Sequence, residues 1–151
     1  MAANTVPIFP LTPLSSVGNI VGGTGVAKSD GTGTAIGTDM IKLATAGADG
    51  AYIESVQFTP SASAVGTSTT ATVLRVYVSN KTSGATTTAD TTLIGELTAA
   101  SVSAASATVA TTTLTLAINR KIAANLTILA SSHVTNAAST SWSGMCYGAS
   151  Y

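Results

Sequence analysis

Charged side chains are scarce in this 151-residue chain: Asp, Glu, Lys and Arg make up 8% of it, where a typical domain carries about a quarter. Six basic and six acidic residues cancel to a formal net charge of zero. This balance argues against nucleic acid and membranes as partners, because both attract proteins through an excess of positive charge. Charge also keeps copies of a molecule apart, so the shortage indicates a building block whose surface other subunits cover.

The residue types that carry most enzyme chemistry are equally few. The lone Cys146 excludes an intrachain disulfide and is predicted to be a small buried hydrophobe, and the lone His133 leaves too few ligands for a metal site. No serine stands in a Gly-x-Ser-x-Gly elbow. The glycine-rich stretch 18–25 lacks the Gly-Lys-Ser/Thr ending of a phosphate-binding loop and is predicted to be a hinge. We therefore expect a non-enzymatic protein with no catalytic residue, metal or cofactor.

Long apolar runs are also missing. The first residues lack the basic region and apolar run of a signal peptide, and no stretch approaches the ~18 apolar residues of a membrane-spanning helix. We expect the chain to be made in the cytoplasm and to fold there without disulfides.

Threonine and serine are abundant instead, at roughly 30% of the chain. They stand among β-branched runs, with turn signals at 30–33 and 48–50. Apolar and polar residues alternate with a period of two in 74–78, 114–118 and 126–130. The pattern predicts an all-β protein, a single antiparallel β-sandwich of jelly-roll type. Its strands are expected at 39–44, 51–59, 72–79, 91–97, 108–118, 125–131 and 141–147.

Three of the four prolines fall within the first thirteen residues. Proline lacks an N–H and holds its predecessor extended, so residues 1–25 are predicted to be an extended arm and hinge, and residues 26–151 the sandwich. The arm is too apolar for a solvated tail. It is expected to dock either across its own domain or on a neighbouring subunit through Val6, Pro7, Ile8, Phe9, Pro10, Leu11, Pro13 and Leu14.

Aromatic residues make up only 5% of the chain, and three of them lie near its end. Trp142, Tyr147 and Tyr151 are candidate interface residues, since aromatic side chains are enriched in subunit contacts. Core packing and a sugar-binding platform are the alternatives.

Several short motifs resemble, in order, those of a family of small proteins encoded by tailed bacteriophages. The family's "DGTGT … FTAGANGS" is similar to residues 30–34 and 43–50, and its "VRLFIHNG" is similar to 74–80. Its "LRASTHN" is similar to 128–133, and both chains close on an aromatic-glycine end, here 147–151. The resemblance implies a virion structural protein, a capsid decoration (cement) protein.

Composition and resemblance thus lead to one main hypothesis. The protein is expected on the capsid surface of a phage virion, with the major capsid protein and further copies of itself as partners and a trimer as the favoured homo-oligomer. Another virion or filament subunit, from a tail, fibre or pilus-like assembly, is the first alternative. A carbohydrate-binding module using Trp142 and Tyr147 is the second.

Overall fold

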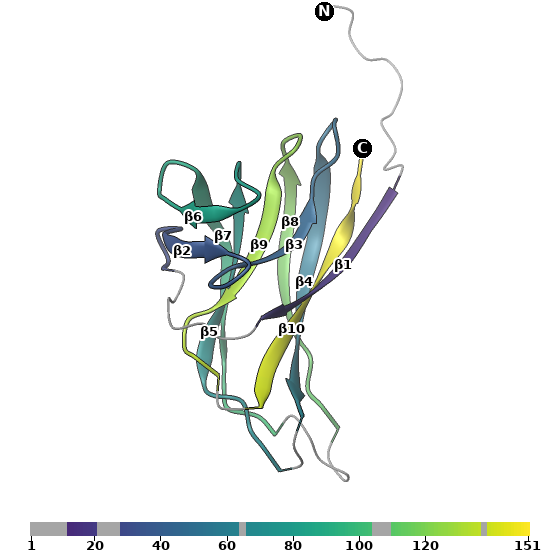
Figure 1. The fold of residues 1–151 in the computed structure, drawn as a ribbon. Coiled ribbons are helices and arrows are strands. Elements are labelled where there is room, and N and C mark those ends of the chain that lie inside the picture. Colours follow the sequence, from purple (N-terminus) through teal and green to yellow (C-terminus); the bar gives the residue numbers. More distant parts are fainter. Residues whose placement is uncertain (1–11, 21–27, 64–65, 104–109, 137–138) are drawn as a thin grey trace, which may run out of the picture.

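The computed structural model describes residues 12–20, 28–63, 66–103, 110–136 and 139–151, and these residues form strands, turns and loops without a helix. Figure 1 shows the strands. Their bounds are β1 Thr12–Ile20, β2 Gly33–Ile36, β3 Ile41–Thr45, β4 Ala51–Ala62, β5 Thr72–Ser79, β6 Gly84–Thr86, β7 Thr91–Ala99, β8 Leu114–Ile122, β9 Thr127–Ser132 and β10 Thr140–Ser150. The prediction of an all-β protein is confirmed.

Eight of these strands form two four-stranded antiparallel sheets. Sheet 1 has the order β1-β10-β4-β8, and sheet 2 has the order β3-β9-β5-β7. The short strands β2 and β6 pair with each other separately, beside sheet 2 (Figure 1). The chain passes repeatedly from one sheet to the other, so neighbours within a sheet are mostly distant in sequence.

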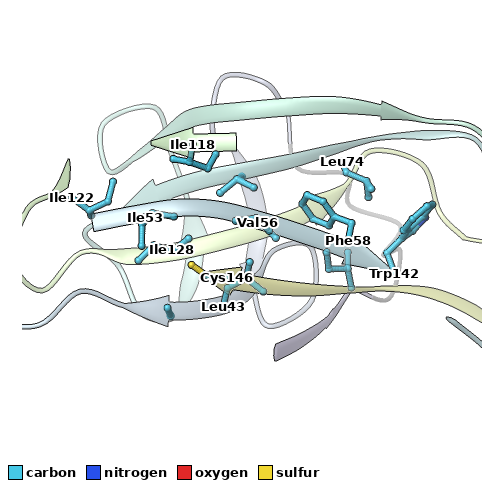
Figure 2. Packing of buried hydrophobic residues seen from close by; sticks show 14 of the residues in the cluster. Leu43, Ile53, Val56, Phe58, Leu74, Ile118, Ile122, Ile128, Trp142 and Cys146 are labelled. Atoms are coloured by element: carbon cyan, nitrogen blue, oxygen red, sulfur yellow. The ribbon is translucent and has the colours of Figure 1, made fainter. Parts of the chain in front are cut away.

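One hydrophobic core joins the two sheets. Phe58 of β4 and Trp142 of β10, from sheet 1, are fully buried in the same cluster as Leu74 of β5 and Ile128 of β9, from sheet 2 (Figure 2). Alternate residues of each strand supply these side chains, because successive side chains of a strand point to opposite faces. The result is a β-sandwich-like arrangement.

The two central strands of sheet 2, β9 and β5, are largely buried on both faces, so the expectation that one face of each strand is exposed is wrong for them. The edge strands β3 and β7 keep exposed residues. All six residues of β9 are buried, as are Arg75 and Tyr77 of β5. A second cluster, built by Met40, Tyr77 and Leu129 with Ile36 of β2, covers the outer side of this sheet. The Tyr77 hydroxyl donates to the Lys28 carbonyl at 3.0 Å, which anchors the covering segment.

The predicted strands overlap seven of the ten observed strands. The range 72–79 agrees with β5, and the predicted strands at 39–44, 51–59, 91–97, 125–131 and 141–147 overlap observed ones. The range 108–118 begins too early, since β8 starts at Leu114. Strands β1, β2 and β6 were not predicted.

The N-terminal segment also differs from its prediction. Thr12–Ile20, assigned to the arm and hinge, is a strand that pairs with β10 along its whole length, from Thr12 opposite Ser150 to Ile20 opposite Trp142. Pro13 is compatible with this strand because it lies at the edge of the sheet. The remaining arm positions, 1–11 and 21–25, lie outside the described residues.

Gly18, the first residue of the glycine-rich stretch assigned to the hinge, belongs to β1, whereas 21–25 lie outside the described residues. A Cβ at this position would stand 2.6 Å from Ile41 Cγ2 of β3, closer than real side chains approach. Glycine therefore lets β1 come close to the facing sheet.

Substitution of two glycines with nearly the same φ, one of them in the turn at 47–50, tests how closely this turn is packed. Gly50 and Gly37 have φ of 98° and 100°, but an added Cβ would meet the Ile122 carbonyl oxygen at 2.6 Å in Gly50 and nothing within 4 Å in Gly37. We expect Gly50→Ala to lower the free energy of unfolding by about 2–3 kcal/mol and Gly37→Ala by about 1 kcal/mol. Urea unfolding measures both, and equal losses would contradict the close approach.

Candidate subunit interface

The outer side of sheet 1 presents rows of side chains that run across all four of its strands. Its middle row runs across the sheet from Val17 of β1 through Met145 and Gln57 to Thr115 of β8. These residues alternate along their strands with the core row that contains Cys146, so they point away from the core.

The rows on either side of the middle row are also made of uncharged residues. One holds small hydroxyl and alanine side chains around Tyr147, and the other is mainly Ser and Thr, with a contact of 3.3 Å between the Thr59 and Thr113 hydroxyls. We call the three rows together the outer face. Its members are Ser15, Val17, Asn19, Ser143, Met145, Tyr147, Ser55, Gln57, Thr59, Thr113, Thr115 and Ala117.

No member of the outer face is charged, and neither β1 nor β10 contains a charged residue. The charged residues of sheet 1 are Glu54, Arg120 and Lys121, which lie in β4 and β8 beyond the Tyr147 row. Val17 is the most exposed of the large hydrophobic side chains described, at 62%. Hydroxyl and amide groups cost far less to remove from water than ions do, particularly where they find new hydrogen bonds. The outer face can therefore be covered by another protein surface without burying an unpaired charge.

Some of the charged residues hold turns away from the outer face. The Asp30 carboxylate accepts hydrogen bonds from the Thr32 N–H at 3.0 Å and hydroxyl at 2.7 Å, and the backbone bond is the main cause of its lowered pKa. Asp90 likewise accepts the Thr87 N–H at 2.8 Å, which holds its pKa well below the usual range. Lys81 adds an ion pair to Asp90 at 3.1 Å. These carboxylates cap loops and do not converge on a site.

His133 belongs to a polar cluster on the outer side of sheet 2. Arg75 bonds to Glu96 Oε2 at 2.9 Å through Nε and to His133 Nδ1 at 2.7 Å through a terminal nitrogen. Among the residues that the structure describes, no three metal-ligating side chains come together. Sequence reasoning missed this cluster because only the register, with Arg75 opposite Glu96, brings its members together.

The predicted interface residues have different positions. Trp142 is fully buried in its own core, so its predicted role as an interface residue is wrong, and its ring cannot serve as a sugar platform. Tyr147 is half-buried on the outer face, while Tyr151 lines an open cleft of about 400 Å³ with Asp49, Lys121 and Ile122.

Two of the predicted arm residues, Pro13 and Leu14, lie in β1, and the others precede it. Pro13 is exposed in β1, whereas Leu14 is partly buried and packs against the core of its own chain, as expected if the segment docks across its own domain. The other six arm residues, Val6, Pro7, Ile8, Phe9, Pro10 and Leu11, lie outside the described residues.

In comparisons with known proteins, no family model, curated protein or solved structure matches the chain. Within the described ranges, no helix is long and apolar enough to cross a membrane.

The burial of Trp142 is directly measurable because this is the only tryptophan. We expect its fluorescence in the folded protein to be blue-shifted and almost insensitive to iodide, since no part of the ring is exposed. The same protein unfolded in urea serves as the control, where quenching should be strong. Equal quenching in both states would contradict the core position.

Burial also raises the pKa of the Cys146 thiol to about 11, from an ordinary value of 9.0. The pKa of the thiol is higher in the folded than in the unfolded protein. The free energy of unfolding is therefore unaffected by this group below about pH 9 and decreases as the pH rises toward 11. The loss should be roughly 2–3 kcal/mol.

Cys146→Ala is the control, because the two proteins differ only in this thiol. The variant should be less stable at pH 7, through the lost packing, and should fall less steeply between pH 9 and 11. Urea unfolding over this range measures both slopes, and identical slopes would contradict the prediction.

Proposed function

We propose that this chain is a non-enzymatic structural protein of a phage virion, a decoration (cement) protein that binds the capsid surface and stabilises the head. The observation that carries the proposal is the uncharged outer face of sheet 1. A protein that works by adding contacts needs a broad surface that is easily desolvated, and the outer face provides one on a rigid four-stranded sheet.

In such a role the binding free energy of each contact can be small, because many contacts add up in the assembly. A specific protein contact buries about 1,200–2,000 Å² in total. When each subunit touches both the major capsid protein and another copy of itself, a weak contact becomes strong through multivalency. The proposed partners are therefore the major capsid protein and a homo-oligomer, with no nucleic acid, membrane or cofactor.

The strand order supports the proposal at the level of architecture. We infer that the sandwich is a jelly roll from the strand orders β1-β10-β4-β8 and β3-β9-β5-β7. A jelly roll has eight strands in two four-stranded sheets, and the chain crosses between the sheets so that strands distant in sequence become neighbours. Jelly rolls recur in viral capsid proteins and in lectins. This is an analogy of fold, so the function rests on the outer face.

The N-terminal segment is the proposed clamp. Residues 6–11 are mostly apolar and contain two prolines, and they directly precede β1 at the edge of sheet 1. A short segment of this composition loses little conformational entropy when it docks, because proline already restricts it. We propose that it grips a neighbouring subunit or the capsid protein.

Binding to phage heads stripped of their decoration tests the function. Full-length protein should co-sediment with the heads at saturating, stoichiometric occupancy and should raise their resistance to heat. A variant lacking residues 1–11 retains every strand from β1 onward and should bind at least about tenfold more weakly, having lost the clamp.

Each result has a distinct meaning. Heads that take up no full-length protein would overturn the decoration function, whereas equal binding by both proteins would overturn the clamp alone. Rods or fibres formed by the purified protein would instead favour the filament-subunit alternative.

A further inference from the structure

The four edge strands of the two sheets differ in how well they are protected against pairing with other chains. An exposed edge carries unpaired N–H and C=O groups, and proteins block such edges with charges, bulges or prolines. Sheet 1 has β1 and β8 at its edges, and sheet 2 has β3 and β7.

Three of these edges carry both a charge and a break in register. Lys42 lies in β3 beside a register shift, and Glu96 lies in β7, whose pairing with β5 also shifts. In β8, Arg120 and Lys121 follow a shift, and Asn119 has a left-handed backbone with φ of 48°. Each feature interrupts the regular row of donors and acceptors that a partner strand needs.

Strand β1 has neither protection. It pairs with β10 over nine consecutive residues without a register shift, and it contains no charged residue. Pro13 blocks only the second position, so 14–20 is a regular, uncharged edge segment. Among the described residues, no strand pairs with its outer side.

We propose that β1 pairs with β1 of a second copy of this chain, antiparallel across a two-fold axis, to join two copies of sheet 1 into one eight-stranded sheet. The inference deepens the proposed function by naming the contact between subunits, and it rests on that function only for its biological purpose.

Three observations favour a second copy over another partner. A two-fold axis brings the residues close to the axis near their own copies, so a charge there would meet a like charge, and β1 has none. Pairing around a two-fold axis is necessarily antiparallel, which is how the other described strands of sheet 1 pair. A head-to-tail ring, such as the trimer favoured from sequence, would need a second open edge, and the other three are protected.

Val17 fixes the expected register. The proline-free segment 14–20 has Val17 at its midpoint, so an axis through that point sets Val17 opposite its own copy. It is also 62% exposed, whereas the other exposed large hydrophobic residue described, Val134, is 38% exposed and lies outside the strands. Pairing would cover this valine and make the two outer faces into one uncharged surface.

The test is the oligomeric state of the purified full-length protein, measured by sedimentation velocity without phage heads. The wild type should be a dimer, and Val17→Lys and Val17→Glu should each raise the dissociation constant at least about tenfold by placing like charges together. An equimolar mixture of the two variants should restore the dimer, because Lys then faces Glu.

Thr115→Lys is the matched control, since Thr115 is exposed in the same row at the opposite edge of sheet 1, and it should leave the dimer intact. Circular dichroism checks that all variants fold. A monomeric or trimeric wild type, a dimer that survives both Val17 variants, or a mixture that fails to associate would overturn the proposal. Capsid binding is measured separately. A monomer that still binds phage heads would contradict the proposed dimer but not the proposed function.

Discussion

The pairing of the C-terminal strand with two partners from the first half of the chain is the interaction on which the rest depends. β10 lies between β1 and β4, and its pairing register covers nine positions with the first and eleven with the second. Its inward residues Trp142 and Cys146 fill the core, while Met145 and Tyr147 contribute to the outer face. Without β10, β1 would have no partner within the described fold, and neither the face nor the edge would exist.

In this arrangement, charged side chains and uncharged hydroxyl side chains have different roles. Carboxylates and lysines hold the turns, as at Asp30 and Asp90, where threonine N–H groups satisfy the charge. Threonine and serine cover the sheet surface, where their branched or small side chains suit the pleated backbone. A face built in this way is hydrated by hydroxyl groups but carries no ions that resist covering. This division links the unusual composition to the proposed role in an assembly.

The two sheets are also unequal, which limits where partners can bind. The outer side of sheet 2 is occupied by the protein's own residues, through Tyr77, Met40 and the Arg75 cluster. Sheet 1 has no comparable cover among the described residues, and its β1 edge lacks the bulges and charges found on the other edges. The chain therefore covers the central strands of sheet 2 with its own residues, and in the proposed function the outer face of sheet 1 is covered by other subunits.

The sequence by itself determined the class of the fold and most of its long strands, because a period of two and β-branched residues are local properties that need no partner. It also anticipated a buried Cys146 and an uncharged surface, since composition alone sets how much charge is available. Only the tertiary structure decided that Gly18 belongs to a strand, that Trp142 faces the core, and that Arg75 meets Glu96 and His133. Each of these depends on register between strands distant in the chain, and a one-residue slip would reverse which face every side chain occupies.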